Sequence, residues 1–142
     1  MSDFEPNLMI VLVAALAGFG VGGLWYSPLL IGELWMKEAG ITQEQIDAGN
    51  KAQTFGLAFV SLLIMSYLLA LFIGSTVELG DGFFSPSQQG AYHGFIVGLG
   101  WVFFAFVVVG RFEQRSWKYI GINGGYWVVT LTTMGGLLGG MQ

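Results

Sequence analysis

The sequence predicts an all-α membrane protein with four transmembrane helices and a short amphipathic interfacial helix between the first and the second. Charged residues make up 10% of the 142-residue chain and apolar residues 54%. A soluble domain instead has roughly 25% charged residues. Four stretches without Asp, Glu, Lys or Arg also approach the roughly 20 apolar residues that a spanning helix needs. These stretches are Leu8 to Tyr26, Phe55 to Val77, Tyr92 to Gly110 and Tyr119 to about Gly139, and together they form a single domain over residues 1–142.

The connection after the first span is predicted to contain two short helices. Because proline disfavours helix at the residue before it, Ser27-Pro28 ends the first span. Residues Leu29 to Ala39 have an apolar face and a charged face, which favours a helix lying on the membrane surface. Gly40 is a suitable C-cap. Thr42 and Gln45 then form the capping box of a new helix start.

The other two connections differ in length and composition. Residues 78–91 contain Gly80-Asp81-Gly82 and Ser85-Pro86-Ser87, which are typical of turns, so this segment is predicted to be a loop. Residues 111–118 are a short connection. The third and fourth spans are therefore predicted to form an antiparallel hairpin.

The basic residues predict an orientation. All five lie in two connections, residues 27–54 and residues 111–118, which face the same side of a four-span protein. The positive-inside rule places both connections in the cytoplasm and both termini on the outer side. The net charge of −4 by itself argues against nucleic acid or an anionic lipid surface as a partner, but the distribution of the charges is more informative than their sum.

Small residues recur at four-residue spacing in three of the spans. Such rows allow close contact between helix backbones in lipid, where the hydrophobic effect does not drive helices together. They are expected to pack the four helices against one another, and a row left over would serve a homo-oligomer or a partner protein. The rows are Ala14, Gly18 and Gly22; Gly94 and Gly98; Gly121 and Gly125; and Gly135 and Gly139.

A structural motif marks the exit of the first span. Trp25 and Tyr26 are aromatic residues of the kind that hold a helix end at the membrane interface, as does Trp35 in the following helix. Ser27 precedes Pro28, which fixes the angle at which the chain leaves the span. This structural role accounts for all of these residues without a ligand.

A basic cluster surrounds the short third connection. Arg111, Arg115 and Lys118 lie beside Trp117, and Glu113 can pair with an arginine across the turn. One interpretation is orientation by the positive-inside rule. The alternative is a contact with a lipid headgroup or small anion, because basic pockets on the cytoplasmic side bind headgroups.

Polar residues also occur within the fourth span. Asn123, Tyr126 and Thr130 share one helix face, and Thr133 extends the series. Polar groups in hydrocarbon hydrogen-bond to neighbouring helices, so these residues are expected to join helices. The alternative is the polar lining of a pore. His93, the only histidine, is interpreted as a polar cap at the outer end of the third span.

The sequence carries no recognisable catalytic chemistry. It has no cysteine, which excludes disulfides and thiolate metal sites. We find no nucleophile–base set, no phosphate loop and no acid or base within a span that a proton pump would need. We therefore expect no enzyme activity, no cofactor and no metal.

Three stretches carry specific motifs. Residues 22–36 read GGLWYSPLLIGELWM, residues 55–59 read FGLAF, and residues 112–135 contain FEQRSWK and NGGYW. Together they resemble the DUF1761 family of small prokaryotic membrane proteins, with Ile31 where the family usually has Phe and with a divergent 78–91 loop. The resemblance implies a multi-pass protein of the prokaryotic (inner) cell membrane and supplies no activity.

Three functions stay open on these observations. The first is a small structural or accessory membrane protein that assembles with itself or with a larger membrane complex, and it follows from the small-residue rows. The second is a homo-oligomeric channel or carrier for a small neutral or anionic solute, with Asn123, Thr130 and Thr133 as its lining. The third is a lipid- or pigment-binding subunit that uses His93 or the aromatic span ends. Membrane lipids are expected partners in each case.

Overall fold

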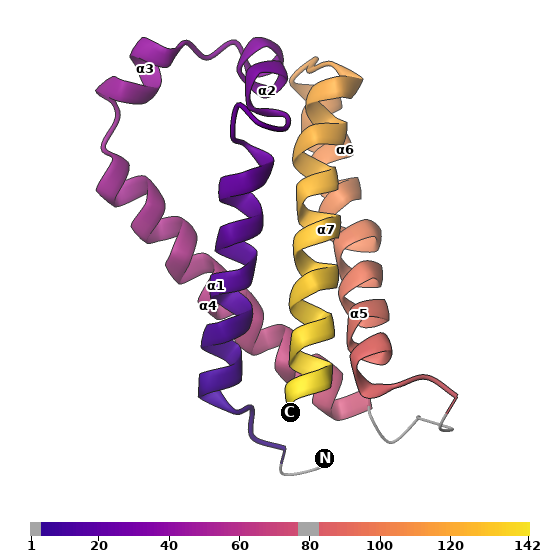
Figure 1. Cartoon of the computed structure of the whole chain (residues 1–142). Coiled ribbons are helices and arrows are strands. Elements are labelled where there is room, and N and C mark those ends of the chain that lie inside the picture. The colour runs from indigo at the N-terminus through magenta and orange to yellow at the C-terminus, as the bar shows by residue number, and fades with distance from the viewer. Residues whose placement is uncertain (1–3, 77–82) are drawn as a thin grey trace.

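The computed structural model describes residues 4–76 and 83–142, and every regular element in these residues is a helix (Figure 1). The predicted all-α fold is confirmed. In chain order, the elements are α1 (Leu8–Trp25), α2 (Gly32–Ala39), α3 (Gln43–Ala48), α4 (Lys51–Thr76), α5 (Pro86–Val97), the π-helix η2 (Gly98–Phe103), α6 (Phe104–Phe112) and α7 (Trp117–Met141).

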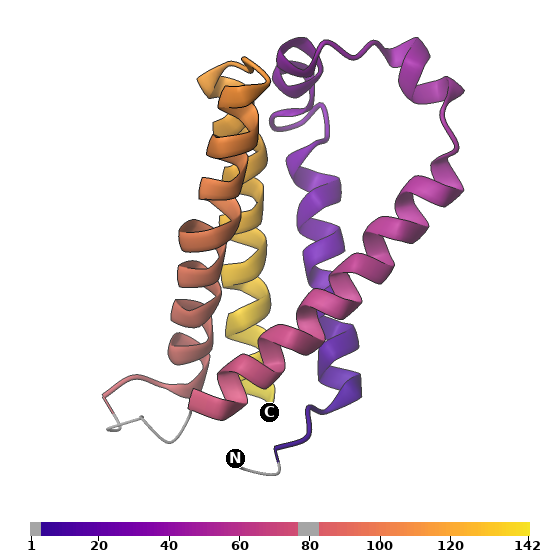
Figure 2. The same cartoon turned by 180° about the vertical axis from the view of Figure 1, so that it is seen from behind.

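Three long helical segments lie side by side, and a fourth helix crosses them. α1, α7 and the continuous helix formed by α5, η2 and α6 run roughly along one direction, whereas α4 crosses α1 obliquely (Figures 1 and 2). α7 packs against α1, α2, α4, α5, η2 and α6. The first and last described residues lie at one end of the bundle, and α2, α3 and the α6–α7 turn lie at the other end (Figure 1).

Three helices in the described residues are long and apolar enough to cross a membrane. They cover Leu8–Trp25, Lys51–Ser75 and Pro86–Phe112. α7 is 25 residues long but less apolar, because it contains Asn123, several threonines and several glycines. Several of these residues, among them Asn123, Thr130 and Gly135, pack against neighbouring helices.

The core lies where α1, α4 and α7 meet. Ala14, Ala15 and Ala70 are fully buried, as are Met134 and Leu138 of α7. The buried Ser66 hydroxyl donates a 2.9 Å hydrogen bond to the Val11 carbonyl, which joins α4 to α1. The alanine and serine side chains here let the helices approach closely; of these residues, Ala14 belongs to a predicted small-residue row.

The closest helix contact is the seam between α5 and α7. A Cβ atom added at Gly90 would collide with the Gly135 carbonyl oxygen, and one added at Gly94 would collide with the Leu131 carbonyl oxygen. Gly18 of α1 faces Thr130 and Met134 in a similar way. These rows pack inside the bundle. Gly121 differs, because no atom lies within 4 Å of the place a Cβ would take.

The prediction of a loop over residues 78–91 is wrong for its second half, because α5 begins at Pro86. The Ser85 side chain accepts a hydrogen bond from the Gln88 backbone N–H, and the Gln88 side chain accepts one from the Ser85 N–H. This capping box, with proline at the first helical position, starts a helix. The predicted turn at Gly80-Asp81-Gly82 lies outside the described residues.

The first connection has the predicted caps. Gly40 adopts φ +70°, in the left-handed region that favours glycine at a helix C-cap. Thr42 and Gln45 form the predicted capping box at the start of α3. α2 begins at Gly32 rather than Leu29, since residues 26–31 form a tight turn instead.

Candidate functional site

Side chains from the two ends of the sequence meet where α1 ends and α7 begins. The chain reverses here through the turn that follows α1, in which the Gly32 N–H donates to the Ser27 carbonyl oxygen at 2.9 Å. A Cβ atom on Gly32 would collide with the Tyr26 carbonyl oxygen, so the turn requires glycine at this position. The turn directs α2, and with it Trp35, back toward the bundle.

Tyr26 is at the centre of this region. Its hydroxyl donates a 2.7 Å hydrogen bond to the Oδ1 of Asn123, and its ring makes edge contacts with Trp35 and Tyr126 at centroid distances of 5.2 and 5.3 Å. Trp25 adds a second bond from α1, because its Nε1–H donates to the Ile122 carbonyl oxygen at 3.1 Å. We call Trp25, Tyr26, Trp35, Asn123 and Tyr126 the aromatic–amide cluster.

The amide of Asn123 is satisfied on both sides. Its Oδ1 accepts from Tyr26, and its Nδ2 donates to the Tyr119 carbonyl oxygen at 3.1 Å. Asn123 and Tyr126 are each 8% exposed. A buried polar side chain is costly when it lacks partners, and here both amide atoms have one. The cluster therefore fixes α1 to α7 by specific hydrogen bonds rather than by apolar contact alone.

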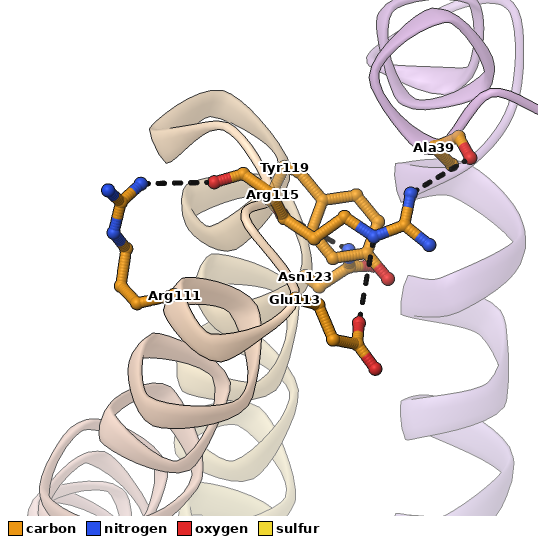
Figure 3. A network of polar contacts seen from close by, with 6 residues as sticks. All are labelled: Ala39, Arg111, Glu113, Arg115, Tyr119 and Asn123. Carbon is orange, nitrogen blue, oxygen red and sulfur yellow. Dashed lines mark hydrogen bonds and ion pairs between the residues drawn. The ribbon is translucent and has the colours of Figure 1, made fainter.

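A second set of contacts joins α2 to the α6–α7 turn. The Arg115 guanidinium donates to the Ala39 carbonyl oxygen at 3.3 Å, forms an ion pair with Glu113 at 3.6 Å, and lies 5.0 Å from the Tyr119 ring centre (Figure 3). The Ser116 hydroxyl donates a 2.6 Å hydrogen bond to Glu38 and accepts one from the Tyr119 N–H. Ser116 is thus the N-cap of α7 and a contact to α2.

Arg111 has a different environment from Arg115. It points away from α1, donates to the Arg115 carbonyl oxygen at 3.2 Å, and lies 4.9 Å from the Trp117 ring centre (Figure 3). Trp117 and Lys118 are exposed. Within the described residues, neither Arg111 nor Lys118 forms an ion pair with a carboxylate. We call Arg111, Trp117 and Lys118 the hairpin face.

The four α7 residues that were considered as a polar lining do not form one set. Asn123 and Tyr126 belong to the aromatic–amide cluster. Thr130 is fully buried beside Gly18, and its hydroxyl has no hydrogen-bond partner in the part of the chain that the structure describes. Thr133 is exposed, and its hydroxyl donates to the Val129 carbonyl oxygen of its own helix. The structure therefore does not bring Thr133 together with the other three.

His93 lies at the opposite end of the bundle. Its Nδ1 is 2.7 Å from the Gln89 carbonyl oxygen, which makes this nitrogen the donor, and its ring contacts Phe72 and Tyr92. In the described residues, no group of three His, Asp or Glu side chains could hold a metal ion.

Two contributors to the site do not appear among the residues that we singled out from the sequence. Ser116 has a local signal, because a serine directly before an apolar helical run is a typical N-cap. Glu38 has none, since its partner is 78 positions away in the chain. The pairing of Arg115 with Glu113 across the turn follows the prediction.

The geometry indicates that this site joins helices that are distant in sequence. Its hydrogen bonds link α1, α2 and α7. Most of the donors and acceptors in the site are already paired with one another inside the protein. The hairpin face is the exception, because it presents cationic groups outward. The site thus has an internal structural part, which comprises the aromatic–amide cluster and the contacts to α2, and an exposed part, which is the hairpin face.

Comparisons with known proteins agree with the motifs. No curated protein and no solved structure matches the chain. One family model matches residues 9–139, and its description is "Protein of unknown function (DUF1761)". The match covers every residue of the aromatic–amide cluster and the hairpin face. The chain therefore belongs to the DUF1761 family.

Proposed function

We propose that this chain is a four-span membrane protein with a structural or accessory role, which assembles with itself or with a larger membrane complex and catalyses no reaction. In this proposal α7 is the fourth span, both termini are on the outer side, and α2 lies at the cytoplasmic surface. Each part of the proposal has its own support.

The length and surroundings of α7 support a fourth span. Its 25 residues extend about 37 Å at 1.5 Å per residue, which exceeds the roughly 30 Å of bilayer hydrocarbon. Asn123 and Tyr126, its polar groups nearest α1, are bonded to or packed against neighbouring side chains rather than turned outward. α7 also runs beside the α5–η2–α6 helix, which is itself long enough to span (Figure 2).

The distribution of basic residues supports the orientation. Lys37 lies on α2, Lys51 begins α4, and Arg111, Arg115 and Lys118 surround the α6–α7 turn. These elements lie at the end of the bundle away from both chain ends (Figure 1). The positive-inside rule assigns that end to the cytoplasm.

The observation that carries the assembly proposal is the exposure of the first part of α4. Residues 51–58 are exposed at every position, and this part of the helix diverges from α1 (Figures 1 and 2). Gly56 has no atom within 4 Å of the place a Cβ would take, and Ala52 lies four residues before it. Exposed small residues near the start of a long helix, followed by the exposed apolar side chains of Phe55 and Leu57, form a surface on which another membrane helix can pack closely.

Cysteine cross-linking tests this proposal, because the chain has no cysteine of its own. Leu57→Cys places a thiol on the free part of α4, where Leu57 is 60% exposed. Val108→Cys is the matched control on α6, where Val108 is 56% exposed. With a short bifunctional thiol reagent in native membranes, we expect a cross-linked product from Leu57→Cys and little from Val108→Cys.

Native mass spectrometry of the unmodified chain in mild detergent completes the test. A homo-oligomer or a complex with another membrane protein is the expected result. A strict monomer with no co-purifying protein, together with equal cross-linking at both cysteines, contradicts the proposal.

One observation favours a second candidate, a channel or carrier for a small neutral or anionic solute. The Thr130 hydroxyl is fully buried and follows Asn123 and Tyr126 along the α1-facing side of α7, so three polar side chains form a row there. Solute flux into liposomes, compared between the native chain and Thr130→Val, tests it. Because Val keeps the shape of Thr, a loss of flux supports transport, and no flux from the native chain removes this candidate.

A further inference from the structure

The α6–α7 turn separates its charges onto two sides. Glu113 and Arg115 form an ion pair on the side of α2, where Arg115 also bonds to Ala39. Arg111 points in the opposite direction (Figure 3). Glu113, the single carboxylate of the turn, is thus paired with Arg115. The positive charge of Arg111 is therefore not neutralised by a carboxylate of the turn. Lys118, exposed and without an ion-pair partner among the described residues, adds a second one.

The guanidinium of Arg111 is held in place by neutral partners. One N–H donates to the Arg115 carbonyl oxygen at 3.2 Å, and the group lies 4.9 Å from the ring centre of Trp117. Neither contact neutralises the charge. Arginine has five N–H donors, so most of them stay free for an oxyanion. Fixing the group in advance also lowers the entropy that binding would cost.

The surroundings of this group suit a ligand at a membrane surface. Trp117, which contacts Arg111 and precedes Lys118 in the chain, is 63% exposed, and Phe112, which follows Arg111, is 86% exposed. Tryptophan concentrates at the headgroup level of bilayers, and planar guanidinium groups match phosphate oxygens in two-point contacts. A ligand with a phosphate and an apolar part would therefore contact both kinds of side chain.

We propose that Arg111, Trp117 and Lys118 form a binding site for a phosphate group, and that its source is an anionic phospholipid headgroup. The site is separate from the assembly surface on α4. It rests on the proposed membrane orientation only in placing the turn at the bilayer surface. A soluble phosphate compound shares the same chemistry, and the experiment separates the two sources.

The test uses the full chain in mild detergent, titrated with phosphatidylglycerol or with phosphatidylcholine of the same acyl chains. Native mass spectrometry counts the bound lipids on each oligomeric species, so the lipid result does not depend on whether the chain self-associates. Arg111→Gln/Lys118→Gln removes both cations. Lys37→Gln/Lys51→Gln is the matched control, because it removes the same charge from the same end of the bundle.

We expect phosphatidylglycerol to bind in preference to phosphatidylcholine. Removing both cations should weaken this binding by about twenty-fivefold, since each cation near an anionic lipid surface contributes roughly fivefold. The control variant should bind as the native chain does. Equal losses in both double variants, or no loss in either, overturn the proposal.

Two further arms complete the design. Lys118→Gln alone keeps the test valid if Arg111→Gln disturbs the turn, because Lys118 forms no ion pair in the described residues; it should weaken binding by about fivefold. Inorganic phosphate is added as the soluble probe. If it binds with the same dependence on Arg111 and Lys118 while phosphatidylglycerol shows no preference, the phosphate site stands and the lipid assignment is overturned.

Discussion

The Tyr26 hydroxyl donates a 2.7 Å hydrogen bond to the Oδ1 of Asn123, a residue 97 positions further along the chain. The bond joins the last turn of the first helix to the first turns of the last helix. It also positions the Tyr26 ring between Trp35 and Tyr126. The two ends of the fold are thereby held at one point, and this arrangement leads to the following predictions.

Tyr26→Phe should lower stability without changing the fold. It removes one hydrogen bond and leaves the side-chain Oδ1 of Asn123 without its partner, at a cost of about 1–3 kcal/mol. Thermal unfolding in detergent measures the effect. Tyr67→Phe is the control, because Tyr67 lies on α4, outside the aromatic–amide cluster, and is 40% exposed. Equal melting temperatures for the two variants would contradict this role of Tyr26.

Glycine-to-alanine changes on α7 should lower the unfolding temperature on the packed face of the helix and not on its open face. Gly135→Ala places a methyl group against the Gly90 carbonyl oxygen, whereas Gly121→Ala places it in open space. Overpacking a close contact costs about 1–3 kcal/mol, so Gly135→Ala should unfold at a clearly lower temperature. Gly121→Ala should be neutral or slightly stabilising, because alanine favours helix over glycine. A reversed order would mean that the α5–α7 seam is not formed.

Ser116 should show two separable roles. Ser116→Ala removes both the N-cap of α7 and the bond to Glu38, with an expected loss of about 0.5–2 kcal/mol for the cap. Ser116→Asp keeps a capping oxygen but places a carboxylate against Glu38, and like charges repel.

The repulsion should be relieved by a second change. Ser116→Asp/Glu38→Gln is expected to regain stability relative to Ser116→Asp alone, in the same thermal unfolding measurement. If the double variant is no more stable than Ser116→Asp, the contact between α2 and the start of α7 does not contribute to stability.

Thiol labelling of single cysteines tests the four-span topology. Glu44→Cys lies in α3, Glu113→Cys lies in the α6–α7 turn, and Gln142→Cys lies after α7. With a membrane-impermeant reagent on intact cells, we expect label on Gln142→Cys only, and label on all three after the membrane is opened. Label on Gln142→Cys and Glu113→Cys together in intact cells would show that α7 does not cross.

Local signals predicted the caps of the first connection well. Gly40 and the Thr42–Gln45 capping box depend on neighbours within three residues, so sequence reasoning reached them directly. The start of α5 shows how the same reasoning failed. Ser85-Pro86-Ser87 fits both a turn and a helix start, and the side chain of Gln88 decides in favour of the helix.

Contacts between residues that are far apart in the chain could not be predicted from the sequence. Trp25, Tyr26 and Asn123 could each be assigned to a span end, but their pairing depends on how α1 and α7 lie side by side. The π-helical segment Gly98–Phe103 was also not predicted, because hydropathy does not distinguish it from an ordinary helical turn. The Phe103 ring at its end occupies the space beside Gly124 of α7.

The modest apolarity of α7 has a consequence for biogenesis. In the proposed topology this helix is synthesised after the other three spans and is the one of the four with the weakest affinity for lipid by itself. Its glycine seam is matched by α5, and only four residues separate α6 from α7. The translocation machinery would therefore release these segments as a hairpin whose glycine seam is already paired, and the polar side of α7 would be covered when it packs against α1.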